Sequence, residues 1–122
     1  MIEIRREDFS IDEIVERMKS PRIGAILTYL GTVREFPEGT GLKFENDKSA
    51  IQKLEEIERR AIHGFDIEDV AIVHRVGFLS ISENILLVAV SAAHRWAALD
   101  ACKGIINDIK DFHESWKKEV PK

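Results

Sequence analysis

In the stretch Ile85-Leu86-Leu87-Val88-Ala89-Val90-Ser91-Ala92-Ala93-His94-Arg95-Trp96, an apolar strand passes directly into a helix. The first half contains no Gly or Pro and is typical of a buried strand. From His94 onward, apolar residues recur at helical spacing through Ala98, Ile105 and Phe112. The stretch therefore predicts a buried strand followed by a long helix of roughly four or five turns.

The basic pair His94-Arg95 lies where this helix begins. The first backbone N–H groups of a helix have no intrahelical partner, and the helix macrodipole is positive at that end. A basic pair at this position favours binding of a phosphate or a carboxylate. We therefore expect a small anionic ligand, and the groups that act on it must come from elsewhere in the chain.

Hydrophobic spacing and turn residues predict the other elements. Residues 2–6 predict a short edge strand, and Phe9–Ile14 has the form of a capping box that opens a short helix ending near Ser20-Pro21. Further strands are expected over 24–34, 42–45, 70–77 and 85–90, with a loop over 35–41 and a surface helix over 51–62. The order β-α-β-β-α-β-β-α predicts an α+β fold with helices packed on a mostly antiparallel sheet.

Length and composition restrict the class of protein. A chain of 122 residues predicts one domain over residues 1–122. No apolar run approaches the roughly 18 to 20 residues of a membrane span, and residues 1–7 lack the apolar region of a signal peptide, so we expect a cytoplasmic protein without a membrane partner. The net charge of −4 argues against a nucleic-acid partner. The single cysteine, Cys102, excludes an internal disulfide, and no metal site is predicted.

Lys110 and Lys117 are the candidate catalytic groups. They share one face at the edge of the apolar stripe if the last helix continues through both. A lysine at such an edge can extend its amine into water. Alternatively, the amines face a pocket, where a partly desolvated lysine can act as an acid, a base or a nucleophile. The pattern by itself leaves both interpretations open.

For two other basic segments, position in the sequence does not by itself separate ligand binding from a structural role. Arg34 ends a predicted strand directly before a Gly-containing loop, which is typical of ligand contacts and also of an exposed strand end. The pair His74-Arg75 lies inside a predicted strand, which favours a structural role.

Five segments in this order resemble the catalytic (large) subunit family of molybdopterin synthase. They are Gly31-Thr32-Val33-Arg34, His74-Arg75-Val76-Gly77, Ser91-Ala92-Ala93-His94-Arg95, Lys110, and Trp116-Lys117-Lys118-Glu119. The resemblance implies an α/β hammerhead fold and a sulfurtransferase of molybdenum cofactor biosynthesis. The implied reaction inserts sulfur into cyclic pyranopterin monophosphate to form the dithiolene of molybdopterin.

The resemblance also implies partners. The sulfur would come from a ubiquitin-like small sulfur-carrier subunit, whose C-terminal Gly-Gly tail, carried as a thiocarboxylate, inserts into the active site. The implied assembly is a homodimer of large subunits within a heterotetramer. No cofactor is implied for this subunit.

The site residues implied by the resemblance include both lysines. Lys110 and Lys117 would be the reactive lysines, and the substrate contacts would be Thr32, Val33, Arg34, His94, Arg95, Lys110, Lys117, Lys118 and Glu119. A non-catalytic binding or scaffold protein of the same fold is the alternative, because the chain ends three residues after Glu119. A non-enzymatic dimeric α+β protein is a third reading if the motif match is a coincidence.

Overall fold

The computed structural model describes residues 1–122. Its elements are β1 (Ile2–Arg5), α1 (Ile11–Met18), β2 (Ala25–Thr32), β3 (Gly39–Phe44), α2 (Lys48–Gly64), β4 (Asp69–Arg75), β5 (Gly77–Ser80), β6 (Asn84–Ala92), α3 (Arg95–Trp116) and β7 (Lys117–Pro121). They form two sheets and three helices.

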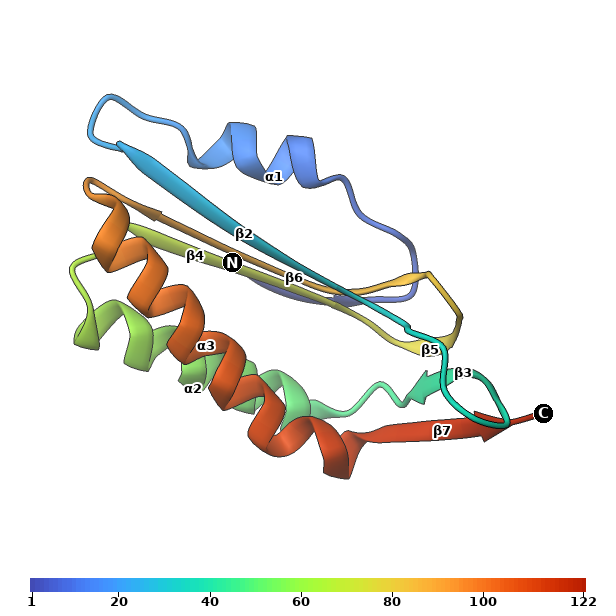
Figure 1. Cartoon of the computed structure of the whole chain (residues 1–122). Coiled ribbons are helices and arrows are strands. Elements are labelled where there is room, and N and C mark those ends of the chain that lie inside the picture. Colours follow the sequence, from blue (N-terminus) through green and yellow to red (C-terminus); the bar gives the residue numbers. More distant parts are fainter.

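The main sheet has the strand order β1-β4-β6-β2. Strand β6 pairs antiparallel with both β4 and β2, whereas β1 joins the edge parallel to β4. Figure 1 shows α2 and α3 on one face of this sheet and α1 on the other. Because helices cover both faces, every residue of β6 after Asn84 is buried, which explains its continuous apolar sequence. The prediction of a mostly antiparallel sheet is confirmed.

Both predicted helix starts are confirmed. At α1, the Ser10 hydroxyl oxygen accepts a hydrogen bond from the backbone N–H of Glu13 at 3.3 Å, and Phe9 packs on the cluster that contains Ile14. At α3, His94 is the N-cap and Arg95 is the first helical residue. Helix α3 has 22 residues, which is about six turns and therefore longer than predicted.

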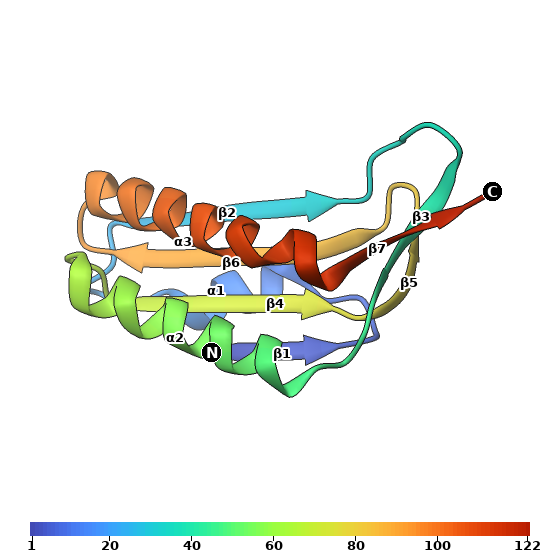
Figure 2. The ribbon, with the colours of Figure 1, turned by 90° about the horizontal axis from the view of Figure 1, so that it is seen from below.

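The sequence did not predict the second sheet, whose strand order is β5-β3-β7. This sheet lies beyond the last turn of α3 (Figure 2). Strand β5 is separated from β4 by a turn around Gly77, whose φ of 91° lies in the left-handed region. The loop predicted over 35–41 is shorter than expected, because β3 begins at Gly39.

The second sheet also corrects the prediction for the two lysines. Helix α3 ends at Trp116, so Lys117 is the first residue of β7 and does not share a helical face with Lys110. The Trp116 indole N–H donates to the Glu45 carbonyl oxygen at 2.7 Å, and β7 then pairs with β3. The strand pairing satisfies the backbone groups that a longer helix would otherwise satisfy.

The core is divided by the main sheet. A large cluster of 23 buried residues lies with α2 and α3, and a small cluster of six lies with α1. Cys102 belongs to the large cluster. None of the three helices combines the length and the apolar composition that crossing a membrane requires.

Two isoleucines of α2 provide a matched test of this core. Ile57 is 3% exposed, whereas Ile62 on the same helix is 41% exposed. We expect Ile57→Ala to lower the free energy of unfolding by about 2 to 5 kcal/mol, because it leaves a cavity, and Ile62→Ala to lower it by less than about 1 kcal/mol. Urea denaturation of both variants measures the difference, and equal losses would contradict the assigned packing of α2.

Candidate active site

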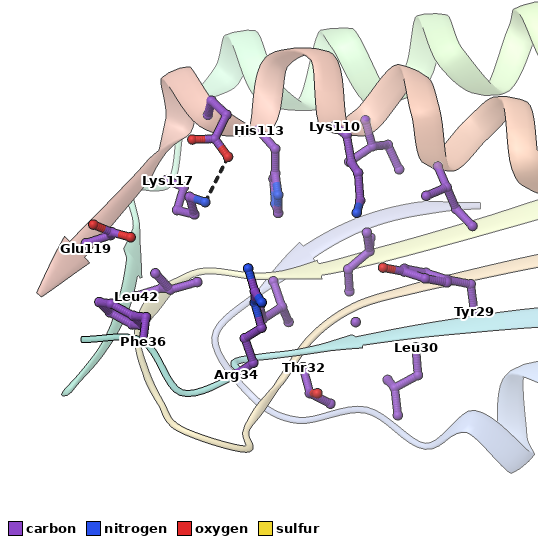
Figure 3. Close-up of a pocket in the computed structure, with 16 residues that line it drawn as sticks. Tyr29, Leu30, Thr32, Arg34, Phe36, Leu42, Lys110, His113, Lys117 and Glu119 are labelled. Atoms are coloured by element: carbon purple, nitrogen blue, oxygen red, sulfur yellow. Dashed lines mark hydrogen bonds and ion pairs between the residues drawn. The ribbon is translucent and has the colours of Figure 1, made fainter. Parts of the chain in front are cut away.

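A cavity of about 550 Å³ lies where the end of β2, the last turns of α3 and the second sheet meet (Figure 3). We call it the site cavity. Its polar lining consists of Tyr29, Thr32, Arg34, Lys110, His113, Glu114, Lys117 and Glu119. Its other lining residues are Leu30, Gly31, Phe36, Leu42, Ile85, Leu86, Ile106 and Ile109. The lining therefore combines an apolar wall with groups that can bind or transfer charge.

Strand register determines which residues of β7 face the site cavity. Lys117 lies opposite Phe44 of β3, and Glu119 lies opposite Leu42. Alternate residues of a strand point to opposite faces, so Lys117 and Glu119 share the face that borders the site cavity. Lys118 points to the other face and borders a separate, smaller cavity beside Glu45. Within one chain, Lys118 therefore does not line the site cavity, and its expected contact with the substrate stays a prediction.

The charges in the site cavity are only partly paired. Lys117 donates a hydrogen bond to Glu114 at 2.9 Å, and this contact lowers the pKa of the Glu114 carboxyl. Arg34, Lys110 and Glu119 make no ion pair within the chain, whereas Lys117 is neutralised locally. Two cations and one carboxylate thus remain available, which favours an anionic ligand that also offers a hydrogen-bond donor.

The structure brings together five of the expected site residues. Thr32, Arg34, Lys110, Lys117 and Glu119 all border the site cavity, although they come from β2, the loop after it, α3 and β7. Val33 does not, because its side chain is only 2% exposed and belongs to the core. Its backbone N–H donates to Glu83, and its carbonyl accepts from Ser82.

His94 and Arg95 lie at the opposite end of α3 from the site cavity. The rise of an α-helix places Arg95 about 22 Å from Lys110 along the helix axis. Both residues are exposed, His94 makes no side-chain capping bond, and the Arg95 guanidinium lies 5.2 Å from the centre of the Trp96 ring. Within one chain, His94 and Arg95 therefore lie too far from the site cavity to line it.

A histidine pair, made of the fully buried His74 and the half-buried His113, adjoins the site cavity. The Nε2 atoms of His74 and His113 lie 2.8 Å apart, and His74 Nδ1 lies 2.6 Å from the Arg75 carbonyl oxygen. The rings of Phe44 and Trp116 pack against both histidines. The position of His74 inside a strand predicted a structural role for it, whereas no sequence pattern singled out His113. One signal could have pointed to His113. It lies three residues after Lys110 and four before Lys117, between the two candidate catalytic lysines.

Both histidines are neutral at physiological pH. Burial and, to a smaller extent, the neighbouring His113 lower the pKa of His74 to about 3, against the opposing effect of the Arg75 carbonyl. Burial also lowers the pKa of His113 to about 4; Lys117 and Lys110 add to this effect, and Glu114 opposes it. The pair therefore presents uncharged imidazoles beside the cations of the site cavity.

The histidine pair predicts a pH dependence of stability. Both pKa values in the folded chain lie below the ordinary value of 6.5. Between its folded and unfolded pKa, each histidine binds a proton in the unfolded chain but not in the folded chain. This stabilisation is complete above about pH 6.5 and is lost as the pH falls through about 4 for His113 and about 3 for His74. For each such proton, the free energy of unfolding falls by about 1.4 kcal/mol per pH unit within this range.

Denaturant unfolding between pH 7.5 and pH 4 measures this slope. We expect His113→Phe to make the fall in stability shallower, because one of the two excluded protons is removed. His63→Phe changes an exposed histidine of α2 and serves as the control, with the wild-type slope expected. An unchanged slope in His113→Phe would refute the assignment.

Comparison with known proteins identifies the family. The model of the MoaE protein family matches residues 4–112. The molybdopterin synthase catalytic subunit of Pyrococcus abyssi is 40% identical over 120 residues, covering 93% of this chain and 80% of that protein.

Solved structures agree with this match. The crystal structure of molybdopterin synthase from Staphylococcus aureus has a chain that superposes with a TM-score of 0.85 at 30% identity, covering 98% of this chain and 90% of that one. A chain from the complex of subunits 1 and 2 of the molybdopterin-converting factor of Helicobacter pylori superposes with a TM-score of 0.77 at 19% identity, covering 98% and 88%, and supports the fold alone. The expected α+β fold is confirmed, and the chain belongs to the MoaE family of molybdopterin synthase catalytic subunits.

Proposed function

We propose that this chain is the catalytic subunit of a molybdopterin synthase. It transfers sulfur from a thiocarboxylated small subunit to cyclic pyranopterin monophosphate and so forms the dithiolene of molybdopterin. The observation that carries the proposal is the convergence of Arg34, Lys110 and Lys117 on one cavity in a chain of this family. These cations come from three separate elements, and no fold requirement brings them together.

The unpaired cations suit the phosphate of the substrate. Arg34 and Lys110 have no anionic partner within the chain, so a phosphate can bind them without displacing a protein carboxylate. Each charge-assisted hydrogen bond contributes roughly 1.5 to 3 kcal/mol. The apolar wall, which includes Leu42 and Ile109, leaves room for the flat pterin rings.

The two lysines have different surroundings, which supports different roles. Lys110 is free of ion pairs, and its ammonium can polarise the substrate at the carbon that the thiocarboxylate sulfur attacks. It can also stabilise the anionic tetrahedral species formed when water cleaves the resulting thioester, which leaves sulfur on the substrate and a carboxylate on the small subunit. Lys117 is held by Glu114, which fixes its ammonium at the wall of the site cavity.

The sulfur donor is proposed to be a ubiquitin-like small subunit with a C-terminal Gly-Gly thiocarboxylate. This donor follows from membership of the molybdopterin synthase catalytic subunit family; the Helicobacter pylori molybdopterin-converting factor is itself a complex of two subunits. A cytoplasmic location is part of the proposal, as is a single domain over residues 1–122.

We further propose that a homodimer completes the site. His94 and Arg95 act as substrate contacts only if they come from a second copy, because about 22 Å of helix separates them from Lys110 within one chain. In a symmetric dimer, His94 of the partner subunit and Arg95 of the partner subunit would supply further groups for the anionic substrate at the opening of the site cavity.

Reconstitution tests the activity. The purified chain is mixed with cyclic pyranopterin monophosphate and a thiocarboxylated small subunit, and the fluorescent oxidation product of molybdopterin is measured. We expect product only when the partner carries the thiocarboxylate. Substrate binding without any product would instead favour a non-catalytic scaffold protein.

Single substitutions test the two lysines. We expect Lys110→Ala and Lys117→Ala each to lower the rate of dithiolene formation by about 100-fold or more, because each removes a cation that stabilises developing negative charge. Lys19→Ala, on the far side of the main sheet, is the control and should keep the wild-type rate. Full activity in either cavity variant would remove that lysine from the mechanism.

Mixing two inactive variants tests the dimer. Arg95→Ala and Lys110→Ala chains that exchange subunits form mixed dimers with one intact site, so roughly a quarter of wild-type activity should return. If Arg95 served the site cavity of its own chain, every site would contain one substitution and the mixture would remain inactive.

A further inference from the structure

The hydrogen bonds of the histidine pair determine which ring nitrogens carry protons. The Arg75 carbonyl oxygen can only accept a hydrogen bond, so the His74 Nδ1 that lies 2.6 Å away must carry its proton. His74 is fully buried among aromatic rings and neutral, and a neutral imidazole has only one N–H. Its Nε2 therefore presents a lone pair.

The same reasoning extends to His113. Its Nε2 lies 2.8 Å from the lone pair of His74, so it must be the donor in that hydrogen bond. Because His113 is also neutral, its Nδ1 presents a lone pair, and this atom makes no hydrogen bond within the chain. The backbone carbonyl of Arg75 thus fixes, through His74, an open acceptor on a side chain that lines the site cavity.

The surroundings of His113 explain what this acceptor can do. Figure 3 shows its ring between Lys110 and Lys117, with Arg34 facing it from the end of the β2 segment. Glu114 and Glu119 are the carboxylates that border the same cavity. The hydroxyl groups of Thr32 and Tyr29 can donate as well as accept. His113 is therefore the one uncharged lining side chain that can accept a hydrogen bond and cannot donate one into the cavity.

A proton relay does not fit this arrangement. A proton that reached His113 and passed to His74 would stop at the Arg75 carbonyl, which has no proton to release. A phosphate does not suit His113 either, because phosphate oxygens also present lone pairs. A ligand N–H group is the complementary partner.

We propose that His113 binds the substrate as a fixed hydrogen-bond acceptor for an N–H group of the pterin ring, and that His74 is the positioning residue that holds it in this tautomer. The inference rests on the proposed function. It orients the substrate, because the phosphate binds at Arg34 and Lys110 while an N–H edge of the heterocycle lies against His113. The contact favours nitrogen heterocycles with a ring N–H over phosphates that lack one.

Nitrogen-15 NMR of the imidazoles in the intact chain tests the tautomers directly. At pH 7 we expect a protonated Nδ1 on His74 and a protonated Nε2 on His113, with the other nitrogen of each ring unprotonated. When cyclic pyranopterin monophosphate is added, the His113 Nδ1 signal should shift as it accepts a hydrogen bond, but it should stay unprotonated. A doubly protonated His113 in the complex, or the opposite tautomer in the free chain, would overturn the proposal.

Steady-state kinetics tests the contact. We expect His113→Phe, which keeps a ring of similar size but has no acceptor, to raise KM for the precursor about tenfold while kcat changes by less than about twofold. His113→Asn restores an acceptor near the position of Nδ1 and should keep KM within about threefold of wild type. His63→Phe is the control, and thermal unfolding verifies that each variant is folded.

These measurements separate the inference from the proposed function. If wild-type chain forms product and His113→Phe has an unchanged KM, the acceptor role fails and the synthase activity stands. If wild-type chain forms no product, the proposed function fails, and with it the assignment of the pterin as the ligand. The tautomers measured in the free chain then still confirm or refute the fixed acceptor on their own.

Discussion

The structure depends on the burial of β6 on both of its faces. Leu86, Val88 and Val90 belong to the large core cluster under α2 and α3, whereas Leu87 and Ala89 belong to the small cluster under α1. One strand therefore holds the two helical layers on the main sheet, because its side chains alternate between them. Antiparallel pairing with β4 and β2 on either side satisfies its backbone, and only two residues separate its end from the start of α3.

The position of the site follows from where α3 stops. The helix runs over the main sheet from the end of β6, and its last turn reaches the second sheet (Figure 2). The bond between Trp116 and the Glu45 carbonyl fixes this junction, and β7 continues from it as a strand paired with β3. The change from helix to strand directs Lys117 and Glu119 toward the end of β2. Without it, the cations of α3 and the loop after β2 would not enclose one cavity.

The site cavity combines cations on flexible side chains with one neutral imidazole, that of His113, which is held in place by its neighbours. Arg34 and Lys110 are exposed cations on flexible side chains, which suits an anion that must enter and leave. The pair of His74 and His113 is different, because aromatic packing and hydrogen bonds hold the two rings in place, and the proposed tautomers would fix where the open acceptor lies. Cations of this kind attract a ligand, and a fixed acceptor selects its orientation.

The sequence by itself determined the strands of a mostly antiparallel sheet, the starts of α1 and α3, and the residue types that bind an anion, but not the strand order or the division into two sheets. These features depend on neighbours in the chain: the apolar run of β6, the cap at Ser10 and the periodicity after His94 are all local signals. The ordered motifs from Gly31 to Glu119 also identified the family.

Only the tertiary structure decided which of these residues meet. The backbone pairing of β7 with β3 directed Lys118 away from the site cavity and ended α3 before Lys117, although Lys117, Lys118 and Glu119 are good helix formers. His74 and His113 lie 39 residues apart, and their hydrogen bond depends on the packing of α3 across the main sheet, which no local pattern encodes.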